Sequence, residues 1–180
     1  MLRTALRHAL AAALVMPAGF GLAGQNNSAS PRLYVFDGGV LASETARYRL
    51  TDADVEAVEL SVASYLIVHP RGTLMFDAGA VADSHFKSDG SPVEEGIVSA
   101  TKPLLPQLAA AGYSPRDVTY FALSHFHSDH TANANEFASA TWIVQKAERD
   151  YMFGDSPQGI IQPATYDALR NANTKLLDNE

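Results

Sequence analysis

Apolar residues fall into short runs that are rich in β-branched and aromatic side chains and are separated by turn residues. The run Leu33–Phe36 predicts a strand that stops at Asp37-Gly38-Gly39, because Asp and Gly together favour a turn. Two further runs, Ser61–Val68 and Thr73–Phe76, flank a turn that contains Pro and Gly, and they predict a β-hairpin. The second of these runs ends at Asp77-Ala78-Gly79, so a carboxylate leaves a buried strand and enters a loop.

The next pattern predicts a helix, because apolar residues recur at near-helical spacing from Ile97 to Ala111 and Gly112 is a natural stop. Pro103 and Pro106 must lie in its first turn, so the helix is expected to begin late. Residues 80–96 are polar and predict a surface loop. Strand and helix patterns then alternate: a strand at 117–123, a short helix to 137, a strand at 141–144, a helix at 147–152 and a strand beginning at 175–177. This alternation predicts an α/β layered architecture.

The N-terminus has the layout of a secretory signal. Arg3 and Arg7 precede the apolar run Ala9–Val15, and small residues follow up to Gly24. Residues 1–24 are therefore predicted to be a cleaved signal peptide and residues 25–32 a flexible lead-in, which places the mature protein in the periplasm or outside the cell. The alternative is an uncleaved anchor, but the run is short for a membrane span and Pro17 interrupts it. No stable membrane span is expected elsewhere.

Composition narrows the candidate chemistry. The formal net charge is −7 and no segment concentrates Lys and Arg, which disfavours a nucleic-acid partner because phosphate binding needs a basic face. The sequence contains no cysteine, so disulfides, thiolate ligands and a Cys nucleophile are excluded. A metal site would have to use His and carboxylate ligands, which favours zinc, manganese or iron.

The strongest chemical signal is the segment His125-Phe126-His127-Ser128-Asp129-His130, which holds three of the six histidines. It follows a predicted strand, where α/β sheets present their ligand sites. Residues two apart in an extended loop project the same way, so His125 and His127 are predicted to bind one ion. Asp129 and His130 lie just beyond, where a turn can aim them at a second ion. The alternative interpretation is a group of surface histidines that binds nothing.

These residues resemble the metallo-β-lactamase superfamily, in which His-x-His-x-Asp-His follows a hydrophobic strand. Phe76-Asp77-Ala78-Gly79 belongs to the same resemblance, and the stretches Leu66–Gly72 and Leu123-Ser124-His125 are similar to lactonase-type members. The resemblance covers about residues 33–177. It implies an α/β fold, the N-terminal half of an αββα sandwich, and a domain over residues 33–180 that is incomplete at its C-terminal end. Ala132 stands where many members have Gly, which is a minor departure.

The resemblance also implies roles for individual residues. His125 and His127 would bind a first zinc ion, Asp129 and His130 a second, and manganese or iron are alternatives. Asp77 would brace the ligands from behind, although Asp also commonly ends strands as a simple turn residue. Asp129 could in addition accept a proton. The family draws a third His, a bridging Asp and a further His from its C-terminal half, whereas no histidine follows His130 in this sequence.

The expected function is therefore a zinc-dependent hydrolase that opens a small-molecule ester or lactone, such as an N-acyl homoserine lactone. In the mechanism that the resemblance implies, two metals lower the pKa of a bridging water and the resulting hydroxide attacks the carbonyl. Hydrolysis of β-lactams or thioesters is a rival within the same class. A hypothesis from another class is a non-catalytic half-domain that lacks the C-terminal ligands, whose exposed half-core would favour self-association.

Overall fold

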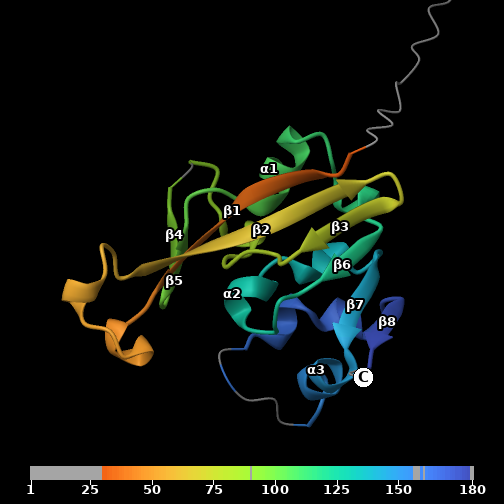
Figure 1. The fold of residues 1–180 in the computed structure, drawn as a ribbon. Coiled ribbons are helices and arrows are strands. Elements are labelled where there is room, and N and C mark those ends of the chain that lie inside the picture. The colour runs from red at the N-terminus through yellow and green to blue at the C-terminus, as the bar shows by residue number, and fades with distance from the viewer. Residues whose placement is uncertain (1–29, 90, 156–158, 160, 179–180) are drawn as a thin grey trace, which may run out of the picture.

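The computed structural model describes residues 30–89, 91–155, 159 and 161–178. The predicted signal peptide and most of the predicted lead-in lie outside the described residues. One mixed sheet of eight strands, in the order β4-β5-β1-β2-β3-β6-β7-β8, runs through the molecule (Figure 1). Its strands are β1 (Arg32–Ala42), β2 (Glu59–His69), β3 (Gly72–Phe76), β4 (Val93–Glu95), β5 (Val98–Ala100), β6 (Tyr120–Ala122), β7 (Thr141–Gln145) and β8 (Thr174–Leu177).

Short helices connect these strands. The α-helices are α1 (Leu104–Ala110), α2 (Ser128–Thr131) and α3 (Lys146–Met152). The 3-10 helices are η1 (Thr45–Tyr48), η2 (Asp52–Asp54), η3 (Asp83–His85), η4 (Pro115–Asp117), η5 (Ala134–Phe137), η6 (Pro163–Thr165) and η7 (Asp167–Asn171). None of the helices in the described part of the chain is long and apolar enough to cross a membrane.

The predicted hairpin lies at the centre of the sheet and is confirmed. β2 and β3 pair antiparallel, with Val68 opposite Thr73, and β1 pairs antiparallel along the other edge of β2. From β3 onward the pairing is parallel, through β6 and β7 to β8. The carboxyl ends of β3 and β6 therefore lie side by side, at the edge where α/β sheets present ligands.

The predicted turn at Asp37-Gly38-Gly39 is wrong, because β1 continues through it to Ala42. The register with β2 shifts between Asp37 and Gly39, so the segment is a bulge within a strand. Gly39 has φ +113°, and a Cβ at this position would lie 2.6 Å from the carbonyl oxygen of Ser99 in β5. The absence of a side chain thus lets β5 approach β1. Arg32, placed in the lead-in, is the first residue of β1.

The predicted helix after residue 97 is confirmed only in its later part. α1 begins at Leu104, as the two prolines require, and Ala100 belongs to β5 instead. The first N–H groups of α1 are capped from a distance, because the carboxylate of Asp83 accepts bonds from Leu104 and Leu105, both at 2.7 Å. The predicted surface loop at 80–96 is also only partly right, since it contains η3 and β4, and Ala80 and Val81 are buried.

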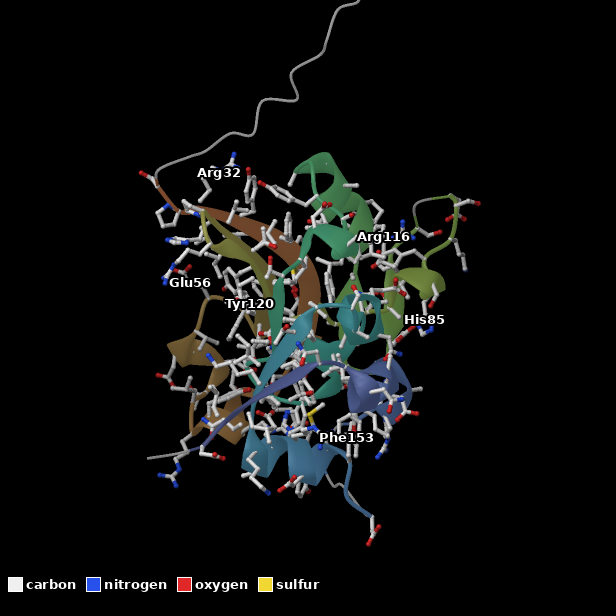
Figure 2. The ribbon with its side chains drawn as sticks, turned by 90° about the vertical axis from the view of Figure 1, so that its right-hand side faces the viewer. Arg32, Glu56, His85, Arg116, Tyr120 and Phe153 are labelled. Atoms are coloured by element: carbon white, nitrogen blue, oxygen red, sulfur yellow. The ribbon has the colours of Figure 1, made fainter. Side chains whose placement is uncertain are left out.

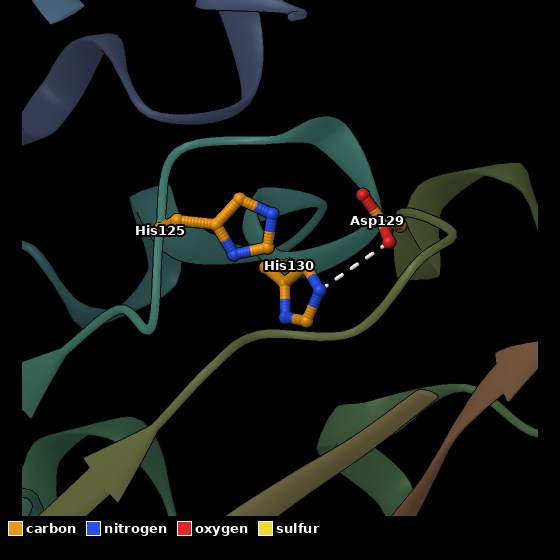
Figure 3. Close-up of side chains that lie close together, drawn as sticks. All are labelled: His125, Asp129 and His130. Atoms are coloured by element: carbon orange, nitrogen blue, oxygen red, sulfur yellow. Dashed lines mark ion pairs between the residues drawn. The ribbon is translucent and has the colours of Figure 1, made fainter. Parts of the chain in front are cut away.

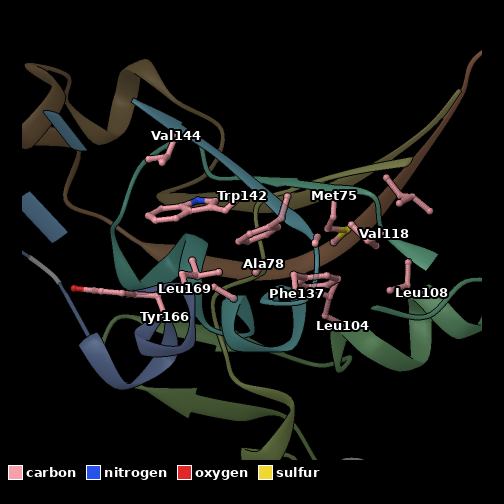
Figure 4. Close-up of a cluster of buried hydrophobic side chains, with 14 of the residues drawn as sticks. Met75, Ala78, Leu104, Leu108, Val118, Phe137, Trp142, Val144, Tyr166 and Leu169 are labelled. Atoms are coloured by element: carbon pink, nitrogen blue, oxygen red, sulfur yellow. The ribbon is translucent and has the colours of Figure 1, made fainter. Parts of the chain in front are cut away.

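The hydrophobic core lies on one face of the sheet (Figure 4). Strand residues pack there against residues of α1, η5 and η7; the central members are Leu66, Met75, Phe121, Trp142, Leu108, Phe137 and Leu169, all with 0% exposure. On the opposite face, Leu33 and Val35 alternate with core residues of β1 and are each 61% exposed among the described residues. Tyr120 of β6 is also exposed (Figure 2). This layered arrangement confirms the predicted α/β class.

Candidate metal centre

The site begins where β3 ends. Asp77 has φ +62°, a left-handed conformation that is uncommon for a residue other than glycine. Its N–H donates to the carbonyl oxygen of Ala122 at the end of β6, at 3.0 Å. The chain therefore turns sharply at the paired strand ends, and the carboxylate of Asp77, only 3% exposed, points toward the loop that follows β6. Such a conformation costs roughly 1–3 kcal/mol and persists only where surrounding contacts hold it.

Backbone and side-chain bonds fasten this turn to α2. Ala78 N–H donates to the His130 carbonyl at 2.8 Å, and Ala132 N–H donates to the Gly79 carbonyl at 3.1 Å. The buried Asn133 side chain donates to the carbonyl of Ala78 at 3.0 Å. Ala132 has helical φ and ψ of −52° and −33°, so its methyl group replaces the glycine of many family members without backbone strain.

Three of the predicted ligands converge. The side chains of His125, Asp129 and His130 each offer a ligand atom, and these atoms all lie within 4.8 Å of one another (Figure 3). His130 Nε2 lies 3.3 Å from Asp129 Oδ2, and the His125 and His130 ring centroids are 4.3 Å apart. The turn of α2 brings Asp129 and His130 back toward the loop that carries His125. The sequence prediction divided these residues between two ions, and that division stays a prediction. In the structure their ligand atoms lie within reach of one another.

The pKa values of the three clustered side chains are shifted in different directions. Burial, followed by the nearby His130 and His127, lowers the pKa of His125, which favours the neutral ligand form. Burial alone would lower the pKa of His130, but hydrogen bonds to Asp129 and Asp77 raise it to about 9. Burial likewise opposes ionisation of Asp129, yet its hydrogen bond to His130 and the charge of that ring lower its pKa. A metal ion that binds His130 would compete with the proton on its ring, so zinc binding here would depend on pH.

Contacts with Asp77 and Ser124 orient the rings of His125 and His130. Asp77 Oδ2 lies 2.9 Å from His130 Nδ1, and Asp77 Oδ1 accepts the Ser124 N–H at 2.6 Å. Ser124 Oγ in turn lies 3.1 Å from His125 Nδ1 and 3.2 Å from His130 Nδ1. Both Nδ1 atoms are thus engaged away from the cluster, which leaves Nε2 of each ring for an ion. The Asp77 carboxylate lies where the sequence predicted a brace.

Ser124 contacts both His125 and His130, although the sequence analysis gave it no role in the site. The only available signal was its position directly before His125, which is the residue whose Nδ1 it contacts.

His127 lies beside the three-residue group and not within it. It is the N-cap of α2, and its ring centroid is 4.5 Å from that of His125. Its Nε2 lies next to Gly159, because a Cβ atom added to that glycine would be 3.5 Å from this nitrogen. The extended backbone at His127, with φ −64° and ψ 152°, separates it from the helical turn that carries Asp129 and His130. Its role as a ligand stays a prediction.

Comparison with known proteins gives this geometry a context. The sequence model described as "Metallo-beta-lactamase superfamily" matches residues 57–176. N-acyl homoserine lactonase AttM of Rhizobium johnstonii is 32% identical over 127 residues, which is 68% of this chain and 48% of that protein. The protein of the same name from Agrobacterium fabrum is 32% identical over 129 residues, with the same coverage. The chain thus spans about half the length of the curated relatives it matches.

Solved structures share the fold. An N-acyl homoserine lactone hydrolase with the product N-hexanoyl-L-homoserine at its catalytic metal centre aligns with a TM-score of 0.62 and 22% identity, over 81% of this chain and 59% of that chain. AidC, described as a dizinc quorum-quenching lactonase, aligns with a TM-score of 0.54 and 19% identity, over 82% of this chain and 58% of that chain. The sheet and helices described above therefore correspond to part of the fold of these proteins, as the resemblance in the sequence implied.

Proposed function

The chain belongs to the metallo-β-lactamase superfamily, and we propose that it is the metal-binding part of a zinc-dependent hydrolase that opens lactone rings, with N-acyl homoserine lactones as the substrate class. The observation that carries this proposal is the convergence of His125, Asp129 and His130 in front of the Asp77 carboxylate. The similarity to the AttM lactonases supports the choice of a lactone over a β-lactam or a thioester.

The donor set fits zinc. Two imidazoles and one carboxylate are ligands that catalytic zinc sites use, and the same set accepts manganese or iron. His125, Asp129 and His130 would hold the ion. His127, which was predicted to share an ion with His125, lies beside them. When bound, such an ion activates water and stabilises negative charge that develops on a carbonyl oxygen.

The protein side chains supply orientation and charge. Asp77 bonds to Nδ1 of His130, so Nε2 of that histidine faces the cluster. Ser124 contacts Nδ1 of His125 and orients that ring in the same way. Asp129 was also predicted to accept a proton during the reaction. Its lowered pKa favours the ligand role, because a carboxylate that ionises easily holds a proton weakly.

Zinc bound per chain after dialysis tests the site. Wild-type protein is expected to retain zinc close to one ion per chain, and the His130→Ala variant is expected to lose it. His85→Ala is the matched control, because His85 is an exposed histidine that pairs with Glu95 outside the cluster. Equal retention by wild type and His130→Ala would refute the site.

Substrate class is tested on the zinc-loaded protein with an N-acyl homoserine lactone, a β-lactam and a thioester side by side. Preferential opening of the lactone supports the proposal. A preference for the β-lactam or the thioester would contradict it and would identify that compound as the substrate class. Retained zinc without any turnover would favour the non-catalytic half-domain. The exposed Leu33 and Val35 would support self-association of that form. The Leu33→Thr/Val35→Thr variant is then expected to associate less than wild type, as measured by sedimentation.

Export belongs to the same proposal, because the basic start and short apolar run of residues 1–24 are typical of a secretory signal. Expression in a Gram-negative host and mass measurement of the periplasmic protein are expected to show cleavage near Gly24. Uncleaved protein in the cytoplasm would contradict it.

A further inference from the structure

The residue between the two motif histidines is held by α3. The ring of Phe126 packs against the ring of Tyr151, with centroids 5.1 Å apart and planes inclined by 43°. The backbone N–H of Phe126 also lies close enough to the carboxylate of Glu148, on the same helix, to lower the pKa of that group. Glu148 and Tyr151 are three residues apart and therefore lie on one face of α3. The ring contact with Tyr151 and the influence on Glu148 both place the centre of the His-x-His segment against this face of α3.

The helix that makes these contacts is itself anchored. α3 begins directly after β7, and Met152 in its last turn is 2% exposed. The next residue, Phe153, packs edge-to-face against Trp142 and Tyr166, with centroid distances of 6.0 and 5.8 Å. Because Trp142 and Tyr166 are core residues, α3 offers a fixed platform to the loop.

The Glu148 carboxylate is costly where it lies. Its Oε1 atom is buried and has no hydrogen-bond partner among the described residues. Burial raises the pKa of Glu148, the Phe126 N–H opposes this rise, and the charge of Asp77 adds to it. A buried carboxylate close to another one destabilises a fold unless its contacts offset the cost. The proposed catalytic chemistry makes no use of this group.

We propose that Glu148 is a positioning residue of the metal centre, which holds the Phe126 N–H and thereby sets the directions of the His125 and His127 side chains. The planar peptide that joins His125 to Phe126 contains this N–H, so a fixed acceptor fixes the plane. With the plane fixed and the Phe126 ring held on Tyr151, the two histidines project from the opposite side of the loop. The inference rests on the proposed function in treating these histidines as metal ligands.

Three substitutions separate position from charge. Glu148→Gln keeps an acceptor oxygen at the same reach but removes the charge, Glu148→Asp keeps the charge but shortens the reach, and Glu148→Ala removes both. Zinc affinity, measured by competition with a chromophoric chelator, is expected to fall about 10- to 100-fold in the Asp and Ala variants, the usual effect of lost outer contacts at a metal site. The Gln variant is expected to stay within about threefold of wild type.

Asp150→Ala is the matched control, because Asp150 lies on the exposed side of α3 and pairs with Lys146. It is expected to bind zinc as wild type does. Cobalt(II) provides a spectroscopic signature: its visible absorption bands should be unchanged in the Gln and Asp150→Ala proteins and altered in Glu148→Asp, because histidine direction determines the ligand geometry. Zinc retention by the Asp variant with loss in the Gln variant would show that charge matters instead, and would overturn the proposal.

Amide hydrogen exchange of Phe126 in the metal-free protein tests Glu148 without reference to zinc. Exchange at this amide is expected to be about tenfold faster in Glu148→Asp and Glu148→Ala, which is the effect of losing one bond to a charged acceptor. The Gln and Asp150→Ala variants should match wild type. If wild type binds no zinc, the proposed function fails while this exchange pattern still decides the role of Glu148. Equal exchange in all variants overturns the inference.

Discussion

Two segments with the same Asp-x-Gly pattern, Asp37-Gly38-Gly39 and Asp77-Ala78-Gly79, have opposite roles in this molecule. Each follows an apolar run, and the sequence predicts that each ends a strand. The first instead lies within a strand that continues to Ala42. The second ends β3, and its Asp77 carboxylate contacts His130 of the candidate metal centre. The two segments touch, because Ala80 N–H donates to the Gly38 carbonyl at 2.8 Å.

Their carboxylates differ in what surrounds them. Asp37 is exposed; its Oδ1 accepts the N–H of Gly39 two residues on, and its Oδ2 lies 3.6 Å from Lys102. Asp77 is buried, and its carboxylate bonds to Ser124 and His130, which are 47 and 53 residues away. A short local motif therefore sets how sharply the chain can turn, whereas the neighbouring strand decides whether the carboxylate faces water or a ligand site.

The largest expected effect is on the free energy of unfolding, when the last glycine of each segment, Gly39 or Gly79, is replaced by alanine. Gly39→Ala should destabilise the protein by roughly 3 kcal/mol or more, because a Cβ there meets the Ser99 carbonyl at 2.6 Å and φ is +113°. Gly79→Ala should cost only about 1–2 kcal/mol, since its nearest neighbour is 3.5 Å away and only the positive φ is strained. Urea unfolding of both variants measures the difference, and equal losses would contradict it.

The next effect is on zinc affinity and compares the two carboxylates. Asp77→Ala is expected to weaken zinc binding about 10- to 100-fold, because His130 loses the group that orients its ring. Asp37→Ala should change it by less than about twofold, since an exposed ion pair contributes little. Chelator competition at a single pH provides the measurement. Similar losses in both variants would mean that the packing of the turns, and not the Asp77 carboxylate, supports the site.

A pH dependence of stability should distinguish the two carboxylates further. The pKa of His130 is raised in the folded protein to about 9, so its contribution to the stability of metal-free protein is fully present below its ordinary value near 6.5 and is lost as pH rises through about 9. Asp77→Asn should reduce this loss because it removes one of the two carboxylates that hold the proton. Asp37→Asn should leave the slope unchanged. Urea unfolding between about pH 6 and pH 10 tests both.

The smallest expected effect concerns Ser124, which links Asp77 to His125. Ser124→Ala should weaken zinc binding about two- to tenfold, because the lost hydroxyl bonds are partly replaced by water at this exposed position. Ser124→Thr, which keeps the hydroxyl, should restore most of the affinity. Ser61→Ala on the exposed surface of β2 serves as the control. No change in the Ala variant would show that Asp77 alone orients the rings.

Some features depend on local pattern and were predictable from the sequence. The central hairpin, the late start of α1, the strands β6, β7 and β8 and the helix α3 all follow from periodicity and turn residues. The cluster of His125, Asp129 and His130 was predictable because its members are close in sequence. The family was predictable because its sequence motif is short and specific.

Other features depend on contacts between distant residues and were decided by the tertiary structure. Pairing of Gly39 with Val62 of β2 keeps β1 continuous past the bulge, and Asp83 caps α1 from 21 residues upstream. Asp77 and Ser124 meet only because β3 and β6 pair in parallel and end together, and Glu148 reaches Phe126 only because α3 packs on the loop. Local sequence determines which conformations a segment can adopt at low cost. Which one it adopts, and what its side chains face, depends on the long-range packing that buries them.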